Sequence, residues 1–490
     1  MWAIEHDFLD SSIRQLYRNV YALLSAPLQR REIVVGLGKP ESNSSIELIG
    51  NYGDFSNLVL KALQARDMFF IIGPPGAGKT SHGLMNILHE HCLHGASILA
   101  GAYTNRAVDE ICARLDAENI DYIRLGSPLG CAPEYQPRLL EQKLEDCCNV
   151  NEVKQLITSV SVVVGTVQAL TSAASTLFSF RSFDLAIIDE ASQILEPHIL
   201  GLLSARHKDE TSAISKFIFI GDHCQLPAVV MQPAERSRVD NPELHKIGLT
   251  DCRVSFFERM LNLLKSEDGT YPENAVYFLE RQGRMHLGIS QVASELFYNG
   301  KLDVVPLPHQ IESVEQKESV GIYNDAMNRN RLLFIDVHDE NNEDHPGSNA
   351  SHAEARVIAN IAVEIYNREG DNFNPETSLG IIVPYRAQIA AIKKYIAFSN
   401  IDKLDKITID TVERFQGSQR DYIIYGFTAR HLHQMSFLTS SRFIEDGKTI
   451  DRKLNVAITR AKSHLIVVGN YTLLSTDPLF KNFIERLERC

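Results

Sequence analysis

The chain of 490 residues carries 49 lysines and arginines against 62 aspartates and glutamates, so its formal net charge is −13. Hydrophobic residues at 44% and charged residues at 23% are ordinary for a folded globular protein and exclude disordered, collagen-like and coiled-coil classes. The acidic balance favours neither a nucleic acid nor a membrane as a partner, because proteins that hold either tightly usually carry excess lysine and arginine. At roughly 150 residues per domain, the length predicts about three domains.

The eight cysteines include no C-x-x-C pair, and the acidic first residues lack the apolar core of a secretory signal. We therefore expect free thiols and a cytoplasmic location. No stretch approaches about 18 uninterrupted apolar residues, so no membrane-spanning segment is predicted.

Residues 1–53 begin with helical periodicity, which breaks at the polar sequence GLGKPESNSS of residues 36–45. The segment is too short to bury a core of its own. We expect a helical stalk that packs on the first domain.

Short apolar runs then alternate with helix-like segments, as expected for parallel strands that are covered on both faces. A polar, turn-rich stretch at residues 265–274 divides the runs into two series. The predicted fold class is α/β, with two tandem domains at residues 54–268 and 269–490, each built on a doubly wound parallel sheet. The predicted strands lie at residues 68–72, 97–101, 161–165, 184–188 and 216–221 in the first series, and begin at residues 276, 332, 379, 406, 422 and 464 in the second.

A phosphate-binding motif follows the first predicted strand. Residues 73–80 read GPPGAGKT, which matches G-x-x-x-x-G-K-[ST], and a helix-like segment comes next. In this motif backbone N–H groups surround the phosphates of ATP, Lys79 reaches the β- and γ-phosphates, and the Thr80 hydroxyl ligates Mg²⁺. A glycine-rich turn without a ligand is the alternative, and the flanking strand and helix argue against it. The predicted nucleotide-binding residues are Gly73, Pro74, Pro75, Gly76, Ala77, Gly78, Lys79, Thr80 and Ser81.

Two adjacent carboxylates, Asp189 and Glu190, follow the apolar run of residues 184–188. Ligands of an open parallel sheet bind at the carboxyl ends of its strands. We expect Asp189 to hold Mg²⁺ and Glu190 to act as the general base that polarises the attacking water. Alone, the pair would be equally compatible with an exposed acidic turn.

Eight motifs occur in a fixed order along the chain: GPPGAGKT, AYTNRAVDEI, IIDEASQ, GDHCQLPAV, ERQGRMH, VPYRAQ, FQGSQRDYII and LNVAITRAK. Together they resemble the superfamily-1 helicases, in the branch that includes the RNA helicase of nonsense-mediated decay and the Okazaki-fragment helicase–nuclease. The resemblance covers about residues 54–470 and corresponds to the C-terminal motor half of such proteins. It implies two RecA-like domains and movement in the 5′→3′ direction.

The resemblance also assigns roles to residues that carry no signal alone. Gln225 is similar to the glutamine that senses the γ-phosphate and the attacking water. Arg284 and Arg460 match two arginines that the second domain of the family offers to the transition state. A guanidinium group suits this role because it is planar and permanently charged. An isolated arginine would otherwise be read as part of a surface ion pair.

Contacts with the nucleic acid are expected from hydroxyls and amides on loops, which bond phosphates without reading sequence. Thr104 and Asn105 resemble the first-domain residues of the family that contact the strand backbone, and an ordinary helix cap is the alternative. Thr166 stands where the family offers another hydroxyl, and the candidates of the second domain carry weaker signals. The predicted nucleic-acid residues are Thr104, Asn105, Thr166, Tyr385, Arg386 and Thr411.

Three positions depart from the family pattern. Gly283 stands where a tyrosine usually stacks on adenine, and Ser56 or Asn57 where a glutamine reads the edge of the base. Gln419 replaces a glutamate near the ribose. Because the phosphate contacts remain while the base contacts are weakened, we expect poor discrimination among nucleoside triphosphates.

The sequence therefore predicts an ATP- and Mg²⁺-dependent helicase or translocase on single-stranded nucleic acid. DNA is favoured over RNA because SAPLQRREIVVGLGKPE resembles the stalk of the helicase–nuclease. Alternatives are an RNA helicase or ribonucleoprotein remodeller, and an ATP-gated clamp that binds nucleic acid without unwinding it. The chain carries no obvious nuclease motif, so a nuclease or other protein partner is expected in trans or as an upstream region.

Overall fold

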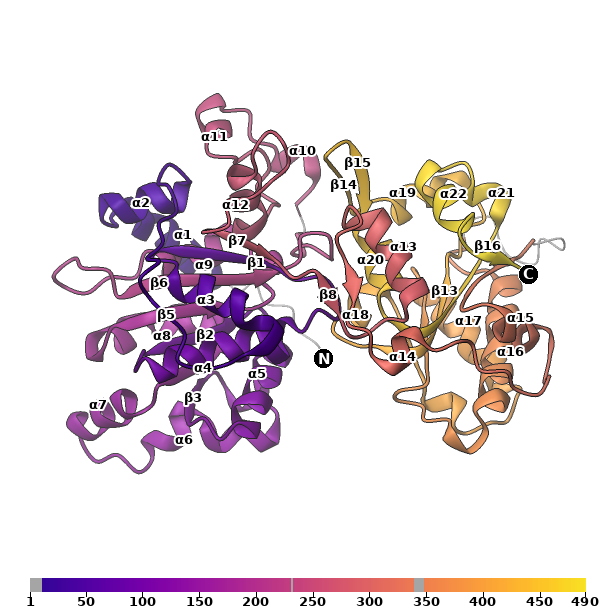
Figure 1. Cartoon of the computed structure of the whole chain (residues 1–490), viewed down its shortest axis with the longest axis horizontal. Helices are drawn as coiled ribbons and strands as arrows, with labels where there is room; N and C mark the ends of the chain where they lie inside the picture. Colours follow the sequence, from indigo (N-terminus) through magenta and orange to yellow (C-terminus); the bar gives the residue numbers. More distant parts are fainter. Residues whose placement is uncertain (1–10, 231, 339–347) are drawn as a thin grey trace, which may run out of the picture. The chain divides into compact units, whose positions relative to one another are not determined.

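The computed structural model describes residues 11–230, 232–338 and 348–490. These residues form two compact units (Figure 1). Unit 1 contains the residues up to Gly73, Gly78–His223 and Pro227–Phe278. Unit 2 contains Leu279–Cys490 together with two short segments, Pro74–Ala77 and Cys224–Leu226.

Unit 1 is built on a seven-stranded sheet with the order β3-β4-β2-β5-β6-β1-β7. All neighbouring strands are parallel. All five residues of β1 are buried, which requires that both faces of the sheet are covered. The strands are β1 (Met68–Ile72), β2 (Ile98–Ala102), β3 (Tyr122–Leu125), β4 (Val162–Thr166), β5 (Phe183–Ile188), β6 (Ile214–Gly221) and β7 (Val276–Phe278).

Helices connect these strands, as parallel pairing requires. Side chains of α8, α9 and α12 pack with alternate residues of the strands in one hydrophobic core. The helices of unit 1 are α1 (Ser11–Leu24), α2 (Leu28–Val35), α3 (Ser56–Gln64), α4 (Met85–Leu93), α5 (Asn105–Ala117), α6 (Leu140–Leu144), α7 (Val150–Ser159), α8 (Val167–Phe180), α9 (Glu196–Leu203), α10 (Ala234–Ser237), α11 (Pro242–Lys246) and α12 (Phe256–Leu264).

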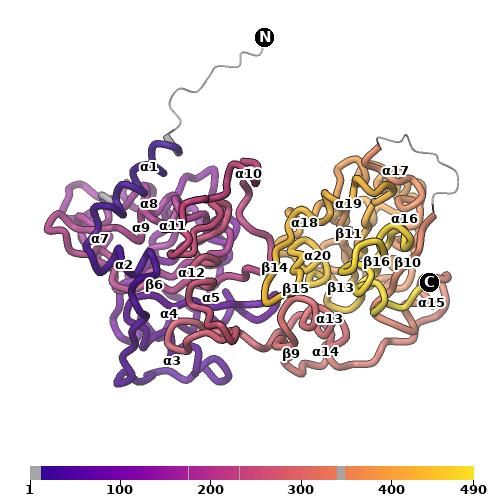
Figure 2. The backbone as a smooth tube through the Cα atoms, turned by 90° about the horizontal axis from the view of Figure 1, so that it is seen from above, coloured from indigo at the N-terminus to yellow at the C-terminus, as the bar shows by residue number. Residues whose placement is uncertain are grey.

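The two N-terminal helices pack on unit 1 (Figure 2). The Asn19 side chain of α1 donates a hydrogen bond of 2.9 Å to the carbonyl of Pro197 in α9. Arg30 of α2 is buried and donates a hydrogen bond of 2.7 Å to the carbonyl of Ile214 in β6. The segment is thus tied to the sheet by specific polar contacts.

One strand lies in a different sheet from the one expected. The run that begins at residue 276 was predicted to open the second domain, with the boundary after residue 268. Instead β7 pairs with β1 at the edge of the first sheet, and the units divide after Phe278. The turn-rich stretch at residues 265–274 is a connection within unit 1, because a polar loop looks the same inside a domain as between two domains.

Unit 2 is built on a six-stranded parallel sheet with the order β12-β11-β13-β16-β10-β17. A hairpin of β14 and β15 turns at Asp446 and Gly447, which both have positive φ, as an Asp-Gly turn of this type requires. The strands of unit 2 are β8 (Arg281–Gln282), β9 (Asp303–Val304), β10 (Leu332–Asp336), β11 (Leu379–Ile382), β12 (Thr408–Asp410), β13 (Arg420–Gly426), β14 (Arg442–Glu445), β15 (Lys448–Asp451), β16 (Ala461–Gly469) and β17 (Glu488–Arg489).

Helices of unit 2 again join the parallel strands, and α16 and α17 contribute to one hydrophobic core with β10, β11 and β13. The predicted fold class, an α/β chain with two doubly wound parallel sheets, is confirmed. No helix within the described ranges is long and apolar enough to cross a membrane. The helices of unit 2 are α13 (Leu287–Phe297), α14 (Pro308–Ile311), α15 (Ile322–Arg329), α16 (His352–Glu369), α17 (Arg386–Ala397), α18 (Val412–Phe415), α19 (Leu432–Leu438), α20 (Arg452–Ile458), α21 (Tyr471–Leu474) and α22 (Pro478–Ile484).

Candidate nucleotide-binding site

The glycine-rich loop leaves the carboxyl end of β1 and turns into a helix. The N–H of Gly73 donates a hydrogen bond of 2.9 Å to the carbonyl of Gly221 at the end of β6, which anchors the start of the loop. Gly78 has a φ of +74°, in the left-handed region that favours glycine. Its carbonyl accepts hydrogen bonds from the N–H groups of both His82, at 3.0 Å, and Gly83, at 2.9 Å.

The second of these bonds spans five residues, so Lys79–Leu84 form a turn of π-helix before α4 begins. Such turns are rare and occur often at functional sites. The turn starts at the lysine and threonine of the motif. The sequence predicted a helix here but gave no sign of its wider first turn.

Four of the predicted catalytic and nucleotide-binding side chains meet at the carboxyl edge of the sheet in unit 1. The Thr80 hydroxyl donates a hydrogen bond of 2.6 Å to Oδ2 of Asp189. Nζ of Lys79 lies 3.7 Å from Oε1 of Glu190. The two motifs are more than a hundred residues apart in sequence, and the parallel sheet brings them together because β1 and β5 end at the same edge.

Asp189 is an unusually buried carboxylate, with 2% of its surface exposed. Burial, followed by the neighbouring charge of Glu190, raises the pKa of Asp189 to about 6, although the Thr80 hydroxyl and Lys79 oppose this shift. A buried carboxylate beside a second carboxylate is a favourable place for a cation. Carboxylate and hydroxyl oxygens are also the hard ligands that Mg²⁺ prefers, so the pair of Thr80 and Asp189 fits this ion.

Glu190 is held in a backbone conformation that few non-glycine residues adopt, with φ 50° and ψ 37°. Its N–H donates a hydrogen bond of 2.9 Å to Oδ1 of Asp189, and its Oε2 accepts one of 3.1 Å from Nε2 of Gln193. Residues held in the left-handed region concentrate at functional sites. The local strain and both hydrogen bonds fix the direction of the Glu190 carboxylate.

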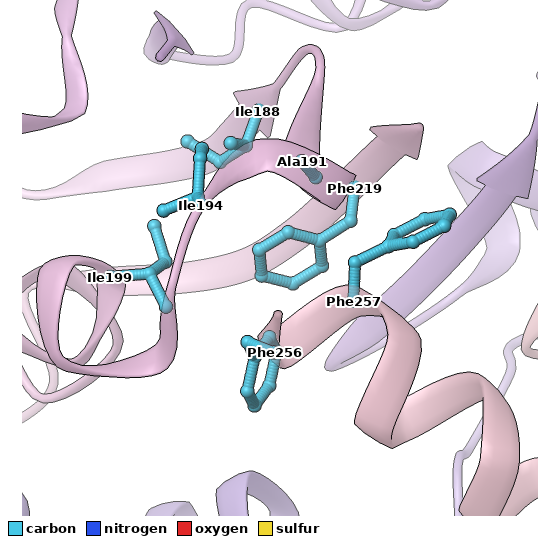
Figure 3. Close-up of a pocket in the computed structure, with 7 residues that line it drawn as sticks. All are labelled: Ile188, Ala191, Ile194, Ile199, Phe219, Phe256 and Phe257. Atoms are coloured by element: carbon cyan, nitrogen blue, oxygen red, sulfur yellow. The ribbon is translucent and has the colours of Figure 1, made fainter. Parts of the chain in front are cut away.

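The residues on either side of the carboxylate pair line a small apolar pocket (Figure 3). Ile188 precedes Asp189 and Ala191 follows Glu190. Aromatic side chains of β6 and α12 complete the lining, so the polar loop rests on packed apolar groups. The lining consists of Ile188, Ala191, Ile194, Ile199, Phe219, Phe256 and Phe257.

Two of the predicted catalytic residues are joined within unit 2. Arg460 is 2% exposed and donates a hydrogen bond of 2.9 Å to Oε1 of Gln225, which lies in the short segment Cys224–Leu226. The same guanidinium donates to the carbonyls of Val456 and Ser418, each at 3.2 Å. A buried permanent charge must be neutralised or hydrogen-bonded on several sides. The Gln225 side chain and the two carbonyls supply such hydrogen bonds.

Arg284 lies in a loop that Gln282 organises. The Gln282 side chain is fully buried, and its Oε1 accepts the N–H groups of Arg284 and Met285, both at 2.7 Å. One guanidinium nitrogen of Arg284 donates a hydrogen bond of 3.2 Å to the carbonyl of Thr459, next to Arg460. The role of Gln282 was not predicted, because a glutamine between an arginine and a glycine gives no sign in the sequence that it is buried.

The predicted nucleic-acid residues of unit 1 occupy the carboxyl ends of β2 and β4. Thr104 is the N-cap of α5, and its hydroxyl accepts the N–H of Ala107 at 3.2 Å. Thr166 is the N-cap of α8 and accepts the N–H of Ala169 at 3.1 Å. The helix-cap reading of Thr104 is therefore correct as a local description, and Asn105 is the exposed first residue of α5.

The predicted nucleic-acid residues of unit 2 differ from one another in their surroundings. The Tyr385 ring is half-buried and stacks on Phe437, with ring centroids 5.0 Å apart. Arg386 is exposed. Thr411 precedes α18 without a side-chain cap bond, so its hydroxyl has no capping role.

The positions that depart from the helicase pattern are also defined. Ser56 accepts the N–H of Tyr52 at 3.2 Å through its hydroxyl, whereas Asn57 and Gln419 are exposed. A Cβ added at Gly283 would contact Leu307 at 3.5 Å, an ordinary van der Waals distance. The space around Gly283 would therefore admit a Cβ, so crowding there does not explain why this chain carries glycine in place of tyrosine.

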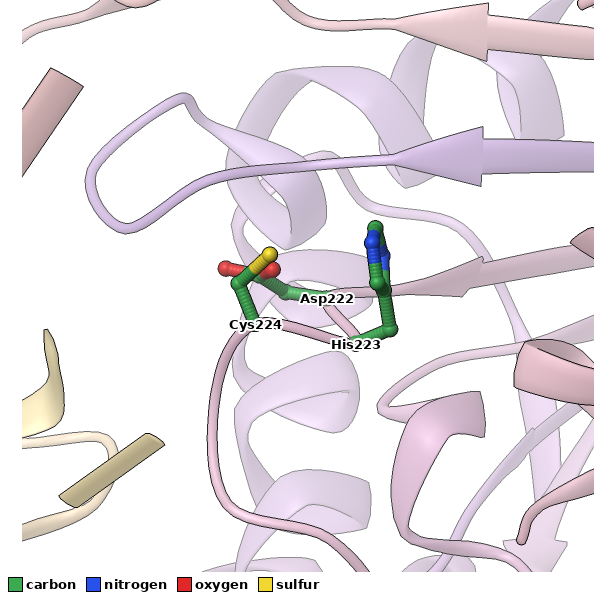
Figure 4. Close-up of side chains that lie close together, drawn as sticks. All are labelled: Asp222, His223 and Cys224. Carbon is green, nitrogen blue, oxygen red and sulfur yellow. The ribbon is translucent and has the colours of Figure 1, made fainter. Parts of the chain in front are cut away.

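The loop that leads to Gln225 carries a group of metal-binding residue types, Asp222, His223 and Cys224 (Figure 4). One ligand atom from each lies within 4.8 Å of the others, and all three residues are buried. The Cys224 thiol donates a hydrogen bond of 3.5 Å to the carbonyl of Phe297. No metal was predicted for these residues from the sequence.

Two family models, both described as AAA domain, match the chain, one over residues 55–154 and 141–233 and the other over residues 252–472. The first match contains the glycine-rich loop and both carboxylates. The second contains Arg284 and Arg460. The chain is thus similar to AAA domains over residues 55–233 and 252–472.

Similar proteins are helicase/nucleases. DNA replication ATP-dependent helicase/nuclease JHS1 of Arabidopsis thaliana is 29% identical over 452 residues, which cover 89% of this chain and 29% of that protein. DNA replication ATP-dependent helicase/nuclease DNA2 of Xenopus laevis is 28% identical over 486 residues, which cover 93% of this chain and 39% of that protein. The predicted resemblance to superfamily-1 helicases, including the Okazaki-fragment helicase–nuclease, is confirmed.

The chain thus spans well under half the length of these two relatives. Among solved structures, Arterivirus nonstructural protein 10 (helicase) in complex with DNA matches with a TM-score of 0.42 and 13% identity, covering 87% of this chain and 65% of that chain.

Proposed function

We propose that this chain is an ATP-dependent helicase or translocase that moves along single-stranded DNA in the 5′→3′ direction. The observation that carries the proposal is the meeting of Lys79, Thr80, Asp189 and Glu190 at one edge of a parallel sheet. Two relatives that are 28% and 29% identical over most of this chain are named DNA replication ATP-dependent helicase/nucleases, which supports the proposal.

The nucleotide would be held by the loop from Gly73 to Ser81. Backbone N–H groups of this loop and the ammonium group of Lys79 bind the phosphates, and Thr80 and Asp189 hold Mg²⁺. The ion, when bound, neutralises charge on the β- and γ-phosphate oxygens. The Thr80–Asp189 distance of 2.6 Å supports this role, because it brings together two oxygen atoms that could ligate the ion.

Hydrolysis needs a base and added positive charge. Glu190 accepts a proton from the attacking water, and its fixed backbone and the bond from Gln193 orient the carboxylate. Arg284 and Arg460 offer guanidinium groups to the charge that develops on the transferred phosphoryl group, with Gln225 beside Arg460.

The preference for DNA over RNA rests on the names of the relatives and on the resemblance of the N-terminal segment to the stalk of the helicase–nuclease. We also propose a cytoplasmic location, which thiols such as those of Cys92, Cys112 and Cys147 favour, because a reducing compartment keeps thiols free. A nuclease activity, which the names of the relatives include, would be supplied by another polypeptide or by a region outside this sequence.

The proposal is tested by strand displacement on three labelled duplexes with a 5′ tail, a 3′ tail or blunt ends. ATP-dependent displacement of the 5′-tailed duplex alone is expected, and a preference for the 3′ tail would contradict the stated direction. Displacement with RNA tails only would favour an RNA helicase or ribonucleoprotein remodeller. ATP-dependent binding to every tail without displacement would favour a clamp.

A further inference from the structure

An aromatic pair outside the phosphate-binding residues lies directly against the glycine-rich loop. The rings of Phe55 and His82 are stacked, with centroids 5.4 Å apart and an interplanar angle of 15°. A Cβ built at Gly78 would lie 3.1 Å from Nδ1 of His82 and 3.4 Å from the Phe55 ring. Both rings therefore border the backbone of the residue that precedes Lys79.

The pair combines a supported ring with an accessible one. Phe55 is half-buried, whereas His82 is exposed. The imidazole is oriented from one side by the Ser81 hydroxyl, which lies 2.9 Å from its Nδ1. The wide turn of Lys79–Leu84 carries His82, so the geometry of the loop and of the ring are set together.

A buried carboxylate fixes the segment that carries Phe55. Glu90 of α4 is fully buried and accepts hydrogen bonds from the N–H of Ile49 at 2.6 Å, the N–H of Gly50 at 2.9 Å and the Tyr52 hydroxyl at 2.7 Å. The N–H of Phe55 in turn donates to the carbonyl of Tyr52 at 3.0 Å. The Phe55 ring is thus held in place before any ligand arrives, which lowers the entropy cost of binding.

We propose that Phe55 and His82 form a stacking platform for the base of the bound nucleoside triphosphate. The inference rests on the proposed nucleotide-binding function and names its base-binding residues. With the phosphates on Gly78, Lys79 and Thr80, the two rings that border Gly78 offer a flat surface beside the loop within unit 1.

The chemistry of the platform predicts tolerance among bases. Every nucleobase offers a π-face to an aromatic ring, and stacking of this kind depends little on sequence. A phenyl ring has no hydrogen-bonding group with which to read the edge of a base. The Ser56 hydroxyl, a candidate for such reading, already accepts the N–H of Tyr52. Affinities for ATP and GTP are therefore expected to lie within about ten-fold of each other.

Calorimetric titration of the full chain with ATP, GTP and inorganic tripolyphosphate, each with Mg²⁺, tests the platform because tripolyphosphate lacks a base. Phe55→Leu and His82→Leu keep apolar volume and remove the aromatic rings. Each is expected to weaken ATP and GTP by about ten-fold while leaving tripolyphosphate unchanged, as the loss of one stacking contact predicts. His82→Phe, which restores a ring, is expected to keep the affinity of the wild type for ATP.

His433→Ala is the matched control. His433 is also an exposed histidine that stacks on an aromatic ring, that of His431, with centroids 5.5 Å apart and an interplanar angle of 15°, but it lies in α19 of unit 2. Its removal is expected to leave all three affinities unchanged. Thermal unfolding of every variant identifies a loss of binding that comes from misfolding.

The outcomes separate the two proposals. If the wild type binds ATP and tripolyphosphate but both leucine variants bind ATP as tightly as the wild type does, the platform is wrong and the proposed function stands. Equal weakening of ATP and tripolyphosphate would also overturn the platform, since the rings would then shape the loop and not hold the base. If the wild type binds neither ligand, both proposals fail.

Discussion

The predicted phosphate-binding residues and the predicted nucleic-acid residues of unit 1 lie at the same edge of one sheet, but their side chains make different contacts. Thr80 and Asp189 contact each other and cap no helix. Thr104 and Thr166 each cap the helix that follows their strand. A polar residue whose contacts serve no local structure indicates a ligand more strongly than one that also stabilises a helix end.

The largest effect is expected at Glu190. Glu190→Gln removes the proton acceptor but keeps the size of the side chain and the bond from Gln193, so kcat for ATP hydrolysis should fall by up to about 10⁴-fold. KM should change little, because the residue holds water and not phosphate. Steady-state kinetics with a separate measurement of ATP affinity checks this result.

A kcat for Glu190→Gln within ten-fold of the wild type would remove Glu190 from the mechanism. The site would then be a structural cluster, and the contrast with the capping threonines would disappear. Lys79→Ala serves as the companion variant, since it is expected to lose nucleotide binding as well as turnover.

Arg460 provides the next largest effect. Arg460→Ala should lower kcat by about 10³-fold, the lower end of the range measured for arginine fingers. Arg460→Lys should recover little of this loss, because an ammonium group cannot replace a planar, multidentate guanidinium. The kinetic measurement needs a thermal unfolding control, since Arg460 also bonds the carbonyls of Val456 and Ser418. Full activity of the alanine variant would show that the arginine is purely structural.

A second buried carboxylate, Glu354 of α16, sharpens the comparison with Asp189. Burial raises the pKa of Glu354 to about 8, although the N–H of Thr428 and the charge of Arg430 oppose the shift. The folded pKa lies above the unfolded value of 4.5, so the stabilising contribution of the protonated form is complete below pH 4.5 and is lost as pH rises through about 8.

Glu354→Gln is neutral at every pH and should abolish this dependence. Its thermal stability relative to the wild type should rise between pH 5 and pH 8 by several degrees, because each unit of pKa shift corresponds to about 1.4 kcal/mol. Melting curves of both proteins across this range provide the test. A constant difference in Tm would mean that Glu354 titrates near its usual range.

The smallest effect separates capping from nucleic-acid binding. Thr104→Val should cost about 1 kcal/mol of stability through the lost cap, and Thr104→Ser should restore it. Thr411→Val should not change stability, because that hydroxyl caps no helix. Affinity for a single-stranded oligonucleotide should weaken by several-fold in both valine variants if both hydroxyls bond phosphate.

If Thr104→Val loses stability but keeps its oligonucleotide affinity, Thr104 caps the helix and does not bind nucleic acid. Fluorescence anisotropy of a labelled oligonucleotide and thermal unfolding together distinguish the cases. Thr104→Val and Thr411→Val thus show whether a threonine that caps a helix also binds nucleic acid, compared with one that caps none.

The regions that could be predicted from the sequence are those in which local pattern and pairing agree. The loop at residues 73–80 and the carboxylates at 189 and 190 each follow a strongly apolar strand. The ends of these strands and the site residues beyond them could therefore be predicted. Strand β3 was missed because its sequence, YIRL, contains a charged residue. Arg124 is buried there and paired with Asp109 of α5, a long-range contact that no local pattern reveals.

The remaining differences have the same physical origin. Strand β7 was placed in the wrong domain because pairing with β1 depends on tertiary contacts and not on its own composition. The role of Gln282 was not predicted because this side chain acts by accepting hydrogen bonds from two backbone N–H groups of its own loop, which no sequence pattern indicates. The stacking of Phe55 on His82 joins residues separated by the whole of β1, and neither position belongs to a recognised motif.

The central claim is that ATP hydrolysis at this site is coupled to a single strand of nucleic acid. The most direct measurement is the steady-state ATPase rate of the wild-type chain with single-stranded DNA, with RNA and with no polymer, with Glu190→Gln as the inactive reference. Coupling predicts a rate that rises with single-stranded DNA and stays near the reference without it. Equal rates under all three conditions would contradict it.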